Sequence, residues 1–96
     1  MNISLNYLRN KNFAIYGLGV TGLSVINYFK KHGFKNYIGW DDNSRIFKKH
    51  MGQKYKRMRS DFLKLINFVD YIIISPGINI NKAKLKNSLL KNKQKI

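Results

Sequence analysis

Cysteine is absent from this 96-residue sequence, only four residues are acidic, and no long hydrophobic run occurs. The absence of cysteine excludes a disulfide-stabilised scaffold and a metal site built from thiolates. The longest apolar run, Tyr71–Ile74 close to Val69, is far shorter than the roughly 20 residues of a membrane-spanning helix. Residues 1–12 are polar and lack the apolar stretch and cleavage site of a signal peptide. We therefore expect a soluble protein of the cytoplasm.

The sequence also lacks the common catalytic motifs. It contains neither the GxxxxGK(S/T) motif that binds ATP phosphates nor a Ser-His-Asp set. Asp41 and Asp42 are adjacent in a turn, so they are not placed as an acid and base pair. His32 and His50 have no carboxylate or second histidine at a metal-ligand spacing. We expect this chain to hold no catalytic residue, no metal ion and no cofactor of its own.

Positive charge dominates the composition, because 19 Lys and Arg residues against four Asp residues give a net charge of +15. Such a charge favours anionic partners. Fifteen of the basic residues are Lys and Asn occurs 12 times, a bias that genome base composition explains as well as selection for a ligand does. The six lysines between positions 82 and 95 favour a solvated helix face over a nucleic-acid-binding arm.

One folded domain over residues 1–96 is expected, since 44% of the residues are hydrophobic and the chain is too short for two cores. An apolar run over 12–16 predicts a first strand. From Val20 to Gly33, apolar and small residues recur every three or four positions, which predicts a helix. A second strand is predicted over 36–40, followed by a turn.

The second half of the chain continues the alternation of helices and strands. The pattern predicts a short helix over 45–51, an edge strand over 55–58, a helix from Ser60, a strand over 69–75 and a final helix over 81–93. Alternating elements are typical of a Rossmann-like, doubly wound α/β fold, in which helices cover both faces of a parallel sheet. We expect about four strands, in the order three-two-one-four.

Gly17, Gly19 and Gly22 form a GxGxxG motif between the first strand and the following helix. The first glycine permits a tight turn, the second lets a phosphate approach the backbone, and the third lets the helix pack close to the strand. The free N–H groups and the dipole at a helix N-terminus favour an anion there. The motif therefore predicts nucleotide binding. Thr21 either contacts the phosphate or satisfies the first turn of the helix.

Two further loops are expected at the same edge of the sheet. Asp41 follows the second strand, where its carboxylate can accept from a ribose hydroxyl or a base N–H, or cap the next helix. Ser75-Pro76-Gly77-Ile78 follows the last predicted strand, and this turn either lets a ligand approach the backbone or makes no contact. Because the carboxyl ends of parallel strands share one edge, the three loops converge on one crevice. The GxGxxG motif and Asp41 alone fit NAD(P) equally well.

Together these loops resemble the N-terminal domain of the Mur ligases that add D-glutamate during peptidoglycan synthesis. The resemblance rests on FAIYGLGVTGLS over 13–24, WDDN over 40–43 and DYIIISPGI over 70–78. It covers nearly the whole chain, and GLGxTGxS paired with SPGI at this spacing is more specific than either motif alone. The resemblance implies a Rossmann-like domain that binds UDP rather than NAD.

The resemblance also implies UDP-MurNAc-L-alanine as the substrate, held by its UDP moiety. Val20 and Thr21 would meet the diphosphate, Asp41 and its neighbours would meet the uracil, and Gly77 would line the same pocket. Many members carry a hydroxyl residue and then a basic one where this chain has Asp42 and Asn43. The residues expected at the UDP site are Gly17, Gly19, Val20, Thr21, Gly22, Asp41, Asp42, Asn43, Ser75 and Gly77.

In such ligases a central domain binds ATP and magnesium, a C-terminal domain helps to bind the amino acid, and D-glutamate attacks an acyl phosphate of the L-alanine carboxylate. The family's fifth strand would begin close to Lys95, so we interpret residues 1–96 as a fragment. Its expected partners are the remaining domains, and alone it would be inactive.

The alternative functions are an NAD(P)-binding regulatory module, which the Ser75 turn disfavours, and a basic nucleic-acid-binding protein. The scatter of basic residues over several segments disfavours the second alternative.

Overall fold

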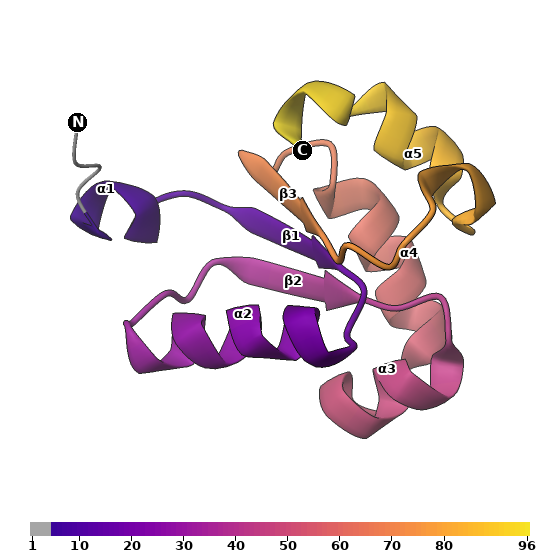
Figure 1. The fold of residues 1–96 in the computed structure, drawn as a ribbon, viewed down its shortest axis with the longest axis horizontal. Coiled ribbons are helices and arrows are strands. Elements are labelled where there is room, and N and C mark those ends of the chain that lie inside the picture. The colour runs from indigo at the N-terminus through magenta and orange to yellow at the C-terminus, as the bar shows by residue number, and fades with distance from the viewer. Residues whose placement is uncertain (1–4) are drawn as a thin grey trace.

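Three parallel strands form the centre of the structure, a computed structural model that describes residues 5–96 (Figure 1). β1 (Phe13–Tyr16) lies between β2 (Tyr37–Trp40) and β3 (Tyr71–Ile74). At the carboxyl end of the sheet, Tyr16 lies opposite both Trp40 and Ile74. The loops that follow the three strands therefore leave the sheet at the same end.

Helices cover both faces of this sheet because alternate side chains of β1 point to opposite sides. On one face Phe13 packs on Phe29 of α2 (Val20–Lys31), with ring centroids 4.9 Å apart. On the other face Tyr16 packs on Phe62 of α4 (Tyr55–Leu65), with ring centroids 6.0 Å apart. Figure 1 shows α2 on one side of the sheet and α4 and α5 on the other. All of β1 is buried, as expected for a strand covered on both faces.

The remaining helical segments are short. They are α1 (Leu5–Arg9), α3 (Ser44–Met51), α5 (Lys86–Lys91) and two 3-10 turns, η1 (Ile80–Lys82) and η2 (Lys93–Lys95). The sequence pattern did not predict α1, which is fixed to the end of α2 by a hydrogen bond from Arg9 Nε to the His32 carbonyl (2.6 Å). Across residues 5–96, no helix combines the length and apolar character needed to cross a membrane.

The α/β class, the parallel sheet and most of the predicted elements are confirmed. The strands predicted over 12–16, 36–40 and 69–75 correspond to β1, β2 and β3, with ends that differ by at most two residues. The helices predicted from Val20 and over 45–51 correspond to α2 and α3. The predicted order of these three strands is also correct, because the last strand lies beside the first.

The edge strand predicted over 55–58 is wrong, because these residues form the start of α4. Tyr55, Met58 and Phe62 recur at steps of three and four, so one face of a helix packs them against the core. No β-branched residue occurs between positions 47 and 65 to favour a strand. Within the described residues the sheet therefore has three strands rather than about four, and α4 begins before the predicted start at Ser60.

The single helix predicted over 81–93 is also wrong, because the segment is divided into η1, α5 and η2. The backbone of Ala83 is extended, with φ −68° and ψ 140°. The next N–H group, of Lys84, donates to the Asp42 carboxylate (2.9 Å) instead of to a helix carbonyl. A contact with a distant loop therefore interrupts a segment whose local sequence favours a helix.

Replacing Phe62 by alanine is expected to destabilise the domain by about 3–5 kcal/mol, because the change leaves a cavity between α4 and the sheet. The Phe62 side chain is 2% exposed and its ring contacts those of Tyr16 and Trp40. Urea unfolding followed by circular dichroism measures the loss. Phe68→Ala is the matched control, because Phe68 is 79% exposed. Its effect should stay within about 0.5 kcal/mol, and equal losses in the two variants would contradict the packing of α4.

Candidate functional site

The turn after β1 is built around Gly17, whose conformation and surroundings both require glycine. Its φ is +103°, a left-handed conformation that other residues rarely adopt. A Cβ atom on Gly17 would stand 2.8 Å from Ser75 Oγ and 3.0 Å from Ser75 Cβ. The N–H group of Gly17 donates to the Trp40 carbonyl (2.7 Å), which extends the pairing of β1 and β2 by one residue.

Gly22 brings α2 against this turn. A Cβ atom on Gly22 would lie 1.8 Å from the Gly17 carbonyl oxygen, so no larger side chain fits without a shift of the backbone. The hydroxyl of Ser75 donates to the same Gly17 carbonyl (3.1 Å). One carbonyl oxygen thus joins the turn after β1, the first turn of α2 and the end of β3.

The N-terminus of α2 is open to a ligand. Gly19 occupies the N-cap position and offers no side-chain acceptor to the first N–H groups of the helix. Nothing lies within 4 Å of the position that a Cβ atom on Gly19 would take. Val20 and Thr21 are exposed. Uncapped N–H groups together with the helix dipole make this end of α2 a suitable place for an anion.

Asp41 connects the end of β2 to the glycine loop. Its Oδ2 atom accepts from the Leu18 N–H (2.7 Å) and its Oδ1 atom from the Asn43 N–H (2.8 Å). The side chain is almost fully buried. Each carboxylate oxygen can accept a second hydrogen bond, so Asp41 can still accept one from a ligand.

These loops enclose an open cleft of about 400 Å³ at the carboxyl end of the sheet. Its lining comprises Gly17, Gly19, Val20, Thr21, Asp41, Ile46, Ser75, Pro76, Gly77 and Ile78. Seven of these ten residues belong to the UDP site predicted from the sequence, so the three predicted loops do meet in one cleft. The turn after β3 is closed by a hydrogen bond from the Ile78 N–H to the Ser75 carbonyl (3.0 Å). Gly77 has open space around it.

Three of the predicted site residues do not line the cleft. Gly22 is buried beneath the glycine loop. Asn43 caps α3, where its side-chain oxygen accepts from the N–H groups of Arg45 (3.0 Å) and Ile46 (3.2 Å). The side-chain oxygens of Asp42 accept from Tyr16, Trp40 and Lys84.

Ile46, Pro76 and Ile78 line the cleft although the prediction did not include them. Pro76 and Ile78 belong to the quoted SPGI segment, which offered a signal for them. Ile46 lies three residues after Asn43, in the first turn of α3. Placing the start of α3 beside the glycine loop would have identified Ile46 as a lining residue.

Two tyrosines beside Asp42 keep their protons at physiological pH. Burial, and after it the hydrogen bond to Asp42, raises the pKa of Tyr16 well above its ordinary value. Burial and the negative charge of Asp42 raise the pKa of Tyr55. Both hydroxyl groups therefore act as hydrogen-bond donors to Asp42.

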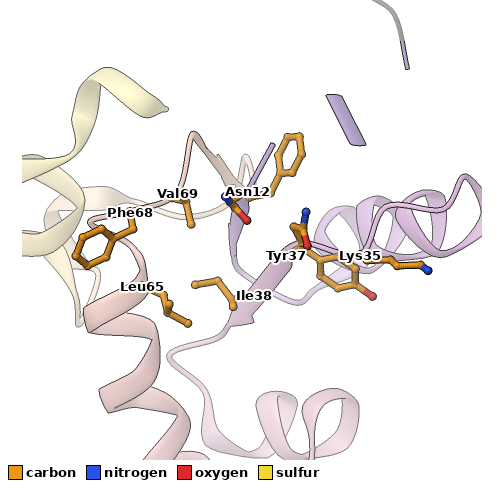
Figure 2. A pocket seen from close by; sticks show the side chains of 9 residues that line it. Asn12, Lys35, Tyr37, Ile38, Leu65, Phe68 and Val69 are labelled. Atoms are coloured by element: carbon orange, nitrogen blue, oxygen red, sulfur yellow. The ribbon is translucent and has the colours of Figure 1, made fainter. Parts of the chain in front are cut away.

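A second cavity, of about 320 Å³, lies at the opposite end of the sheet (Figure 2). Figure 2 shows Ile38 of β2 and Leu65 at the end of α4 facing each other across it, with Phe68 and Val69 nearby. This cavity has no glycine loop and no helix N-terminus among its lining residues. In the described part of the chain, no three His, Cys, Asp or Glu side chains gather at a metal-binding distance. The cleft at the carboxyl end is therefore the candidate site.

Comparison with known families gives a match over residues 11–96 to the N-terminal domain of MurD-like Mur ligases. The chain is 35% identical over 78 residues to the UDP-N-acetylmuramoylalanine–D-glutamate ligase of Wolbachia pipientis wMel, covering 79% of this chain and 15% of the relative. It is 37% identical over 87 residues to the ligase of the same name from Buchnera aphidicola subsp. Schizaphis graminum (strain Sg), covering 86% of this chain and 19% of the relative. The chain thus spans less than a fifth of the length of these relatives. No solved structure matches it significantly.

Gly22→Ala is expected to destabilise the domain by at least about 3 kcal/mol, because overpacking against fixed backbone forces a shift of α2 or of the glycine loop. Gly19→Ala adds the same methyl group where nothing lies within 4 Å, so its cost should be limited to the poorer helix capping by alanine, about 1 kcal/mol or less. Urea unfolding of the two variants and the parent chain tests this pair. Similar stabilities for both variants would contradict the close contact at Gly22.

The free energy of unfolding should fall as the pH rises above about 10, the ordinary pKa of tyrosine. In the unfolded chain Tyr16 loses its proton there, whereas the folded chain retains it because the pKa of Tyr16 is raised. The unfolded state then binds fewer protons, so the loss from Tyr16 approaches about 1.4 kcal/mol per pH unit. Tyr16→Phe lacks this contribution and serves as the control, since it keeps every other residue of the parent. Urea unfolding of both proteins at increasing pH should show the stability advantage of the parent shrinking, and a constant difference would contradict the argument.

Proposed function

This chain belongs to the MurD-like N-terminal domain family of the Mur ligases, and we propose that its cleft binds the UDP moiety of UDP-N-acetylmuramoyl-L-alanine. The observation that carries the proposal is the meeting of the glycine loop, Asp41 and the Ser75 turn around one cleft at the N-terminus of α2. Relatives of the chain are named as ligases of UDP-N-acetylmuramoylalanine and D-glutamate, and a substrate of that name carries a uridine diphosphate group.

The diphosphate is bound in this proposal by backbone groups. The ten residues that line the cleft include no lysine or arginine, so the N–H groups at the start of α2 and the helix dipole supply the attraction. Gly19 leaves the space that a phosphate needs to reach this backbone. Val20 and Thr21 also line the cleft. In this proposal the Thr21 hydroxyl adds a further donor.

The uracil ring is assigned to the end of β2. Its imide N–H is a hydrogen-bond donor, and Asp41 is the one carboxylate that lines the cleft. The hydrogen bonds from Leu18 and Asn43 hold that carboxylate in place and leave acceptor capacity for the ligand. The Ser75–Ile78 turn, with open space around Gly77, also lines the cleft.

For the full-length ligase we propose the ATP-dependent joining of D-glutamate to the L-alanine carboxylate in peptidoglycan synthesis. In this proposal ATP and magnesium ions are bound by other domains of the ligase, which are also the partners of this domain. The residues described here bind and orient the nucleotide end of the substrate. We assign no catalytic residue to them.

Calorimetric titration of the chain with UDP and, separately, with NAD tests the ligand class. We expect UDP to bind more tightly, and Gly19→Ala to weaken UDP binding by about tenfold or more, because its methyl group fills the approach to the α2 N–H groups. The unfolding free energy of Gly19→Ala, expected to lie within about 1 kcal/mol of that of the parent, shows whether the variant is folded when its binding is measured. Tighter binding of NAD than of UDP would contradict the proposal.

A further inference from the structure

Asp42 lies at the centre of a hydrogen-bond network behind the cleft. Its Oδ1 atom accepts from the Tyr16 hydroxyl and from Trp40 Nε1 (3.0 Å), and its Oδ2 atom accepts from the Lys84 N–H (2.9 Å). Its main-chain carbonyl accepts from the Tyr55 hydroxyl (3.0 Å) and from Lys84 Nζ (2.9 Å). Protein donors thus hold both carboxylate oxygens and the main-chain carbonyl of Asp42.

The donors come from four separate parts of the chain. Tyr16 ends β1, Trp40 ends β2, Tyr55 begins α4, and Lys84 lies between η1 and α5. The Tyr16 oxygen also accepts from the Leu85 N–H (3.2 Å), which extends the network to the start of α5. The network therefore ties the loop after β2 to the helices on the face of the sheet opposite α2.

This network fixes the residue that precedes Asp42. Asp41 lines the cleft and accepts from the Leu18 N–H of the glycine loop. Because the side chain and the carbonyl of Asp42 are anchored from several directions, the peptide that joins Asp42 to Asp41 has little freedom to rotate. The orientation of the Asp41 carboxylate and the position of the glycine loop then both depend on Asp42.

The charge of Asp42 argues against a direct role at a diphosphate. A carboxylate beside a diphosphate repels it, and the structure directs this carboxylate to Tyr16, Trp40 and Lys84, away from the residues of the cleft. Removing the charge would therefore tighten binding if Asp42 lay beside the diphosphate, whereas a positioning role predicts weaker binding.

We propose that Asp42 is a positioning residue of the nucleotide site, which acts through its bonds to Tyr16 and Lys84 to hold Asp41 and the glycine loop in their binding arrangement. This inference rests on the proposed binding of UDP. It assigns Asp42, which the sequence placed among the ligand-binding residues, to the support of the site.

Calorimetric titration with UDP of the parent chain, Asp42→Asn and Tyr16→Phe tests the inference. Both variants should bind UDP about three- to tenfold more weakly, the loss that corresponds to one or two hydrogen bonds. The affinity of the double variant for UDP should be at most about twofold lower than that of the weaker-binding single variant, because both changes break the same network. Tyr28→Phe is the matched control, since its ring lies on α2 against His32 and Phe34, and it should bind UDP as the parent does.

Amide NMR spectra of the free proteins supply a readout that does not depend on ligand. The Leu18 and Asn43 amides both donate to Asp41, and in each variant the informative amide is the one distant in sequence from the substitution. The Leu18 amide should shift in Asp42→Asn, the Asn43 amide should shift in Tyr16→Phe, and both should stay unchanged in Tyr28→Phe. If Asp42→Asn does not fold, Tyr55→Phe replaces it, because that variant removes only the bond to the Asp42 carbonyl. Its Leu18 and Asn43 amides should also shift, and its UDP binding should weaken.

The outcomes separate this inference from the proposed function. Equal or tighter UDP binding by Asp42→Asn, or by Tyr55→Phe in its place, overturns the positioning role and leaves the proposed function intact. Unshifted Leu18 and Asn43 amides in the variants also overturn it. Failure of the parent chain to bind UDP overturns the proposed function and this inference with it.

Discussion

The close approach of Gly22 to the Gly17 carbonyl oxygen determines where the candidate site lies. Because a Cβ atom on Gly22 would stand 1.8 Å from that oxygen, α2 can begin directly above the end of β1 only with glycine at this position. The same oxygen accepts from the Ser75 hydroxyl, so the end of β3 is drawn to the same point. The uncapped N-terminus of α2, the end of β2 and the Ser75 turn then surround one cleft.

The two adjacent aspartates have the same side chain but different surroundings. Asp41 faces the glycine loop and lines the cleft, whereas Asp42 is turned toward Tyr16, Trp40 and Lys84. Consecutive residues at the end of a strand point to opposite sides of the sheet. One carboxylate is therefore available to the cleft and the other to the helices behind it. The raised pKa of Tyr16 follows from the same arrangement, because its hydroxyl is buried and bonded to Asp42.

The sequence was sufficient to predict the parts of the fold that local chemistry determines. The apolar strands, the glycine turn and the periodic helix α2 carry strong local signals, and these predicted the meeting of the three loops. The failures occurred where long-range contacts decide. Residues 55–58 become helical because Tyr55 and Met58 face the core with Phe62, and the last helix is broken because Lys84 reaches Asp42 across 42 residues of sequence. The placement of Asp42 is held in part by the same Lys84, a donor that no local pattern brings to this loop.

In the proposed binding of UDP, the net charge of +15 has a smaller part than its size suggests. None of the 19 basic side chains lines the cleft. Lys84 has a structural role behind it, because its Nζ atom donates to the Asp42 carbonyl. A general positive potential raises the local concentration of an anionic nucleotide without orienting it. Orientation requires donors in fixed directions, and backbone N–H groups at the end of a packed helix supply them. In the proposed function, specificity therefore depends on the three glycines of the GxGxxG motif and on the loops after β2 and β3, while the lysines would act only at long range.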